Sequence, residues 1–157
     1  MKASLLDFSE WVLSHPWRGR EREAISLYVF GFLQKACRQG GILRDPTQIG
    51  IEVALPQLPG PRRKKNVCKD LVIWTEPAMT CWDASGKAIN RPIAIMEWKR
   101  GPGDTAEGDI SWLCEYCKYA SPFVGYSVVL DVDGLHPRGL RCARIAGGAV
   151  ERECLVR

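Results

Sequence analysis

The hydrophobic pattern of this chain changes near residue 41 from the spacing of helices to the alternation of strands, and this change most constrains the fold. Apolar residues recur at helical spacing over 1–15 and again over 21–37, where the pattern stops at Gln39, Gly40 and Gly41. Short apolar runs with strand-like alternation follow at 49–55, 70–74 and 93–99. The sequence therefore predicts two helical segments followed by three strands.

The elements after these three strands complete an α/β pattern. They are a helix over about 109–120, a strand over 126–131 and a weak hairpin over about 141–156. A chain of 157 residues has room for one domain with a substantial core. We expect a single domain over 1–157, with its core at about 21–131, built as an α/β sandwich whose mixed central sheet is flanked by helices.

The composition is that of a globular protein, with 46% hydrophobic and 25% charged residues. A net charge of +4 permits an acidic partner such as nucleic acid but does not by itself establish one. No apolar run approaches the roughly 20 residues that cross a bilayer, and Asp7 and Glu10 interrupt the first apolar segment. We expect a cytoplasmic protein, with no membrane partner, whose seven cysteines are reduced.

The third strand carries charge at the end of an apolar run. Because side chains alternate along a strand, Ile95, Glu97 and Lys99 share one face, whereas Met96 and Trp98 share the other. A carboxylate and an ammonium are therefore predicted to stand side by side. The alternative is a surface ion pair at the strand end.

Asp70 opens the second strand, which is equally apolar. An acid on a core strand is costly unless a cation compensates it, and either a divalent metal or a salt bridge would do so. Phosphodiester hydrolysis uses such a set of groups. Carboxylates hold Mg²⁺, the metal polarises the phosphate, and a lysine orients or deprotonates the attacking water or stabilises developing charge.

Asp70 followed by Glu97-Trp98-Lys99 at a strand end resembles the PD-(D/E)xK nuclease superfamily, over roughly Glu21 to Leu130. The core of that superfamily runs helix, three strands, helix, strand, as predicted here. The resemblance implies a restriction endonuclease-like fold, Asp70 and Glu97 as metal ligands, and Lys99 as a catalytic residue. It also implies Mg²⁺ as cofactor, with Mn²⁺ as a substitute, and nucleic acid, expected to be DNA, as partner.

Many members of the superfamily add a glutamate on the first helix. Glu23 is the candidate here, because it shares a helical face with Leu27 and Phe30, and Glu21 is the alternative. The chain departs from the superfamily's pattern at Lys69, where proline is frequent.

Basic residues outside this set are candidates for contact with phosphates. Four form a cluster in the loop before the second strand: Arg62, Arg63, Lys64 and Lys65. The cluster fits a solvated run of charge equally well. Lys118, on the later helix, lies where related nucleases often position the phosphate.

Other residues admit a structural role as readily as a chemical one. Glu52 is either a further metal ligand or, more in keeping with its strand, a half-exposed strand residue or an ion-pair partner. Cys114 and Cys117 belong to an apolar helical stripe, which favours packing over zinc binding. Three tryptophans are expected in the core rather than stacked on bases: Trp74, Trp98 and Trp112.

These observations leave three functions open. The first is a Mg²⁺-dependent DNA endonuclease, favoured because the aspartate, glutamate and lysine are all present. The second is a non-catalytic module of the same fold that binds nucleic acid or a protein. The third is the nuclease subunit of a larger recombination or defence assembly, with a homodimer or a partner supplying recognition.

Overall fold

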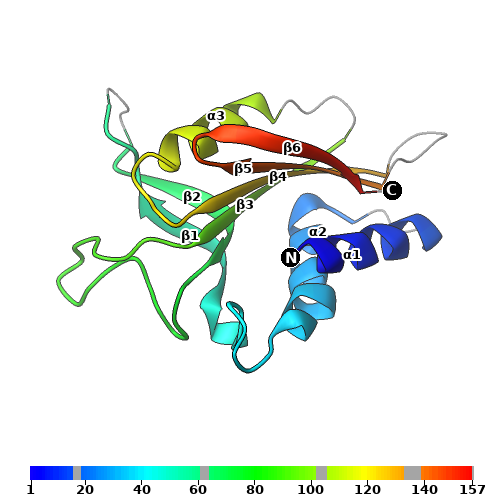
Figure 1. Ribbon diagram of the computed structural model, residues 1–157, viewed down its shortest axis with the longest axis horizontal. Helices are drawn as coiled ribbons and strands as arrows, with labels where there is room; N and C mark the ends of the chain where they lie inside the picture. The colour runs from blue at the N-terminus through cyan, green and yellow to red at the C-terminus, as the bar shows by residue number, and fades with distance from the viewer. Residues whose placement is uncertain (16–18, 61–63, 102–105, 133–138, 157) are drawn as a thin grey trace.

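A six-stranded mixed sheet forms the centre of the molecule in the computed structural model, which describes residues 1–15, 19–60, 64–101, 106–132 and 139–156 (Figure 1). The strands lie in the order of the sequence, from β1 at one edge to β6 at the other. Their bounds are β1 (Ile49–Pro56), β2 (Asn66–Ile73), β3 (Ala94–Arg100), β4 (Val124–Asp131), β5 (Gly139–Ala146) and β6 (Ala149–Val156).

One pair of neighbouring strands is parallel in this otherwise antiparallel sheet. β1, β2 and β3 pair antiparallel, β3 and β4 pair parallel, and β5 and β6 extend the sheet antiparallel. A parallel pair needs a crossover connection, and helix α3 (Glu107–Tyr116) supplies it between β3 and β4. The predicted α/β class, with a mixed central sheet, is confirmed.

Helices cover both faces of the sheet. α1 (Lys2–Ser14) and α2 (Glu21–Tyr28) lie on one side and α3 on the other (Figure 1). Each face consequently has its own hydrophobic cluster, called here the α1/α2 cluster and the α3 cluster. Among the residues described, no helix has the length and apolar character needed to span a membrane.

The second helical segment is less regular than the sequence predicts. α2 passes into a π-helical turn, η1 (Val29–Leu33), and then into a short 3₁₀ turn, η2 (Gln34–Ala36). A π turn adds a residue and shifts the faces of the residues that follow. Val29 and Leu33 are buried, but Phe30 is 64% exposed. The apolar pattern over 21–37 predicts a helix that is buried around most of its circumference, and this prediction is wrong at Phe30.

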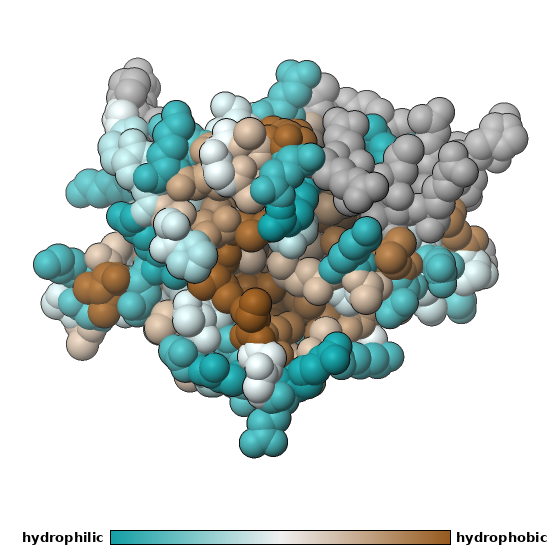
Figure 2. Space-filling view, in the orientation of Figure 1, coloured by the Kyte–Doolittle hydropathy of each residue, from teal (hydrophilic) through white to brown (hydrophobic). Residues whose placement is uncertain are grey.

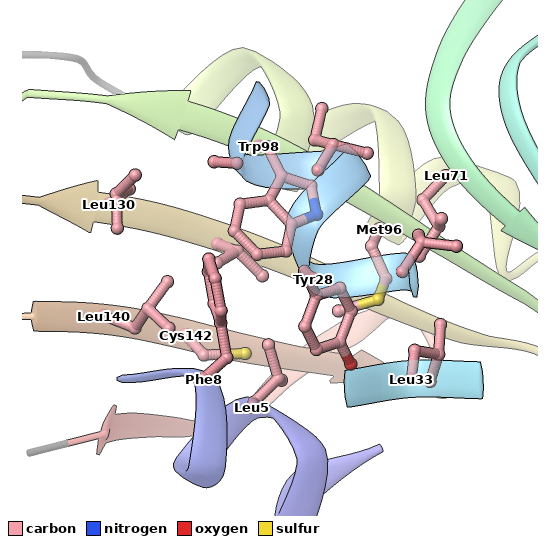
Figure 3. Packing of buried hydrophobic residues seen from close by; sticks show 14 of the residues in the cluster. Leu5, Phe8, Tyr28, Leu33, Leu71, Met96, Trp98, Leu130, Leu140 and Cys142 are labelled. Atoms are coloured by element: carbon pink, nitrogen blue, oxygen red, sulfur yellow. The ribbon is translucent and has the colours of Figure 1, made fainter. Parts of the chain in front are cut away.

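Aromatic rings fill the α1/α2 cluster. Trp98 packs against Tyr28, with ring centroids 5.3 Å apart, and edge-on against Phe8, with centroids 5.9 Å apart (Figure 3). Trp74 and Trp112 are buried in the α3 cluster on the other face. The expectation that these three tryptophans belong to the core is confirmed.

The first two strands exchange faces at one position. Ile51 packs against the α1/α2 cluster, whereas Val53, two residues later, packs against the α3 cluster. Strict alternation would keep them on one face. Between them, Glu52 has φ of 52°, in the left-handed region that non-glycine residues seldom occupy. The break lies opposite Asp70, because Ile51 pairs with Leu71 and Val53 with Lys69.

β2 begins four residues earlier than expected, at Asn66, so the prediction that Asp70 opens this strand is wrong. The hairpin ladder with β1 continues to the pair Pro56–Asn66. This outer half of β2 has exposed positions, such as Cys68, and carries no apolar run that would mark it as a strand. Asp70 therefore lies in the middle of a strand, between Lys69 and Leu71, which pair with Val53 and Ile51 of β1.

Candidate functional site

β3 presents Glu97 and Lys99 on the face covered by α3. Met96 and Trp98 belong to the α1/α2 cluster and Ile95 to the α3 cluster, so the predicted alternation of β3 is confirmed. Glu97 is 4% exposed, and Lys99 is half-buried near the end of the strand.

Asp70 reaches β3 through its side chain. Its Oδ2 accepts a hydrogen bond from the backbone N–H of Trp98, at 2.7 Å. The ladder between β2 and β3 runs from Ile73–Ala94 to Leu71–Met96, and the Asp70 carboxylate takes over as acceptor just beyond it. Since Trp98 lies between Glu97 and Lys99 in sequence, this bond brings all three predicted residues to one place.

Lys69 is the first site residue that the sequence analysis missed. It is 4% exposed, and its Nζ forms an ion pair with Oε1 of Glu97. The same Nζ lies 3.7 Å from the ring centroid of Trp112 on α3, in a cation–π contact. The buried carboxylate thus has a cation of the protein itself beside it.

The charge of Glu97 is finely balanced. Burial raises its pKa to about 7, against the opposing effect of Lys69, and the negative charges of Asp70 and Asp109 raise it further. Near neutral pH, a modest change of surroundings therefore changes the protonation of this carboxyl group.

Asp109 is the second residue that the sequence analysis did not place in the site. It lies in the first turn of α3, and its Oδ2 is 3.1 Å from Nζ of Lys99. Burial lowers the pKa of Lys99, but Asp109, with smaller contributions from Glu21 and Asp70, outweighs it and raises the pKa. Lys99 also donates a hydrogen bond to the carbonyl of Trp98, at 3.0 Å. The lysine is therefore held in its charged form.

The two candidate helix acids have different environments. Glu23 is exposed and closes the N-terminus of its own helix, accepting hydrogen bonds from the backbone and side chain of Arg20. These bonds lower its pKa. Glu21 is half-buried and its charge acts on Lys99. Between the two, Glu21 is the acid whose charge reaches the Asp70–Glu97–Lys99 group.

Glu52 pairs with a cation at the edge of this group. Its Oε1 lies 2.6 Å from Nε of Arg22 on α2, and both side chains are solvent-accessible. This agrees with the half-exposed, ion-paired role given as the more fitting alternative.

The basic candidates differ in position. Lys64 and Lys65 are exposed just before β2, whereas Arg62 and Arg63 lie outside the described residues. Lys118 is exposed just past the C-terminal end of α3, the end opposite Asp109. Lys118 therefore does not join the group around Lys99.

The site offers few side chains that could bind a metal ion. Within the described ranges, no three side chains of histidine, cysteine, aspartate or glutamate are arranged to hold a metal ion, and Cys114 and Cys117 are free thiols that pack against the α3 cluster. Mg²⁺, however, keeps several waters and takes one or two carboxylates together with substrate phosphate. Asp70 and Glu97 fit that limited requirement, provided that Glu97 is released from Lys69.

Comparisons with protein-family models, with curated proteins and with solved structures each gave no match for this chain. The assignment of a function consequently depends on the geometry above.

Proposed function

We propose that this protein is a Mg²⁺-dependent nuclease of the PD-(D/E)xK type that hydrolyses phosphodiester bonds in DNA. The observation that carries the proposal is the 2.7 Å hydrogen bond from the backbone of Trp98 to Asp70. It fixes a carboxylate beside a second carboxylate, Glu97, and a charged lysine, Lys99. An aspartate and an E-x-K segment on neighbouring strands form the arrangement that the resemblance implies.

The residues divide the chemistry among them. Asp70 and Glu97 would hold the cation, which when bound polarises the phosphate and makes a water more acidic. Lys99 positions the attacking water and stabilises the negative charge that develops on the phosphate. Asp109 orients the Lys99 ammonium and keeps it charged.

Two further features support the proposal. The order of α2, β1, β2, β3, α3 and β4 is the helix, three strands, helix, strand order of the superfamily's core. In addition, the left-handed backbone at Glu52 costs of order 1–3 kcal/mol, and such conformations gather at functional sites. Here that conformation lies opposite Asp70.

The partners follow from the same proposal. A chain of net charge +4 is attracted to a polyanion, and the exposed pair Lys64 and Lys65 precedes the strand that carries Asp70. One site cleaves one strand, so double-strand cleavage requires a homodimer or a partner that also supplies recognition. We place this activity in the cytoplasm.

The test is a cleavage panel of plasmid, linear, single-stranded and junction DNA, with Mg²⁺ or Mn²⁺. We expect the wild type to cleave at least one form, and Asp70→Asn and Lys99→Ala to lose at least about a hundredfold in rate. Asp7→Asn and Lys87→Ala are matched controls at exposed positions remote from the site, and both retain the wild-type rate. Undiminished cleavage by the site variants, or no cleavage of any form by the wild type, contradicts the proposal.

One observation favours a second candidate, a non-catalytic module of the same fold that binds nucleic acid. Lys69 already compensates the charge of Glu97 in a buried ion pair, so no metal is needed there for stability. In that case the wild type binds DNA in a gel-shift assay, with or without EDTA, and Lys64→Ala with Lys65→Ala weakens binding. The same preparation leaves every substrate of the cleavage panel intact.

A further inference from the structure

An apolar groove lies at the other end of β3 from Glu97 and Lys99. Its volume is about 660 Å³, within the range of small-molecule sites. Ile93, just before β3, and Ala94, its first residue, form part of the groove's lining, and Val124 and Tyr126 of β4 continue it. The groove is consequently separate from the proposed active site.

The groove opens on the face shown in Figure 2, where a hollow lined by apolar residues lies beside the N-terminal end of α1 (compare Figure 1). Ile42, on the loop that forms one wall, is 78% exposed. An isoleucine so exposed at the edge of an apolar hollow is a surface that an apolar ligand would cover.

Every charged side chain that lines the groove is a cation. They are Lys2 on α1, Arg38 after η2 and Arg144 on β5, and the lining includes no aspartate or glutamate. Arg144 is neutralised by Glu151, which leaves Lys2 and Arg38, both exposed, as the cations at the rim. An apolar floor with cations at its edge is complementary to a molecule with an apolar body and one anionic end.

We propose that this groove binds a small amphipathic carboxylate, with its hydrocarbon part on Ile93, Ala94 and Tyr126 and its carboxylate at Arg38. The apolar part is removed from water, and the carboxylate forms a charge-assisted hydrogen bond with the guanidinium. This role is independent of the nuclease activity and of its carboxylates.

Octanoate and octan-1-ol are the probes, because they share a hydrocarbon chain and differ in charge. Titrated into the full chain below micelle-forming concentrations and followed by NMR chemical shifts, octanoate binds about tenfold more tightly than the alcohol. Shifts are expected at Ala94, Val124 and Tyr126. Arg38→Gln weakens octanoate binding more than octan-1-ol binding and so removes most of the preference for octanoate.

A pair of surface variants provides the control. Ile42→Asp places a negative charge at the rim and weakens octanoate binding about tenfold or more, whereas Ile89→Asp, at an equally apolar but remote exposed position, has no effect. Both residues are exposed, so folding is preserved. Equal affinity for the two probes, or equal loss in both aspartate variants, overturns the proposal. The protein could instead sediment with anionic lipid vesicles and not bind octanoate. If Ile42→Asp abolishes that sedimentation, the groove contacts a membrane surface, and this result also overturns the proposal.

Discussion

The two faces of β3 are both buried, but by different kinds of interaction. On the α1/α2 side, Trp98 packs among Phe8 and Tyr28, and the contacts are dispersion and ring geometry (Figure 3). On the α3 side, one residue earlier in sequence, Glu97 is equally buried beside Lys69. The two faces of this one strand are therefore buried differently, one by aromatic packing and the other with an ion pair.

The difference between the faces shows where this molecule accepts an energetic cost. The face of β3 that carries Trp98, called here the aromatic face, stabilises the fold directly. A buried ion pair, such as the one on the opposite, charged face, seldom contributes more to stability than hydrophobic residues of the same size would. The aromatic face has one unfavourable feature: Nε1 of Trp98 is buried without a hydrogen-bond partner among the described residues. We infer that the charged face exists for chemistry and the aromatic face to hold β3 in place.

The largest effect is expected on the aromatic face. Trp98→Ala removes a fully buried ring and lowers the free energy of unfolding by about 4 kcal/mol, measured by urea denaturation. Trp98→Phe keeps an aromatic ring and removes the unpaired N–H, so its cost is smaller, about 1–2 kcal/mol. Equal costs for the two variants would show that ring packing is not what holds this face.

The next effect separates the buried ion pair from ordinary core packing. Lys69→Met leaves Glu97 without a cation, so the pKa of Glu97 rises further and the carboxyl group is neutral at neutral pH. We expect a cost of about 3 kcal/mol at alkaline pH, where Glu97 ionises and an unpaired charge remains buried. Combining Lys69→Met with Glu97→Leu replaces the pair by apolar groups and restores most of the stability. If the double variant is as unstable as the single one, the pair itself is a net source of stability and the contrast between the faces disappears.

The pH dependence of stability, measured in EDTA, also tests the difference between the two faces. The folded-state pKa of Glu97, about 7, is above the unfolded value of 4.5. The folded state therefore binds more protons between these values, so stability from this group is complete below about pH 4.5 and is lost as the pH rises to about 7. The loss is up to about 3 kcal/mol. We expect Glu97→Gln, compared with wild type by urea unfolding at several pH values, to lack this decline; an identical pH profile for the two proteins would contradict it.

The smallest effect is at Lys99. Asp109→Asn removes the partner of a partly exposed lysine, so the free energy of unfolding changes by less than about 1 kcal/mol. The pKa of Lys99 falls, because Asp109 is what raises it against burial. NMR titration of the Lys99 side chain measures the change, and an unchanged pKa would show that Asp109 does not hold this lysine.

The part of the site that the sequence predicts is the part governed by local rules. Alternation along β3 is enough to place Glu97 beside Lys99 and Trp98 opposite them, and the order of helices and strands follows from periodicity. Lys69 is different. Counted from Leu71 and Ile73, alternation assigns it to the aromatic face, and only the exchange of faces near Glu52 brings it to Glu97.

The helix acid also depends on a contact that periodicity does not contain. Glu21 and Glu23 are two residues apart on one helix, and the hydrogen bonds with Arg20 decide which of them is engaged in capping. Likewise, Phe30 is exposed although the apolar pattern predicts burial, because it lies on the side of the helix opposite the buried Ala24, Ile25 and Tyr28. In each case the environment of the residue depends on contacts in the folded protein, which the spacing of residues in the sequence does not reveal.

The most direct test of the central claim, that the charged face of β3 exists to hold a divalent cation, is the effect of Mg²⁺ on thermal unfolding. For a site with a dissociation constant of about 1 mM, about 10 mM Mg²⁺ stabilises the fold by about 1.4 kcal/mol, which raises Tm by roughly 3–5 °C. We predict this rise for wild type and for Asp7→Asn, and its absence in Asp70→Asn. An equal rise in all three proteins, or none in the wild type, would contradict the claim.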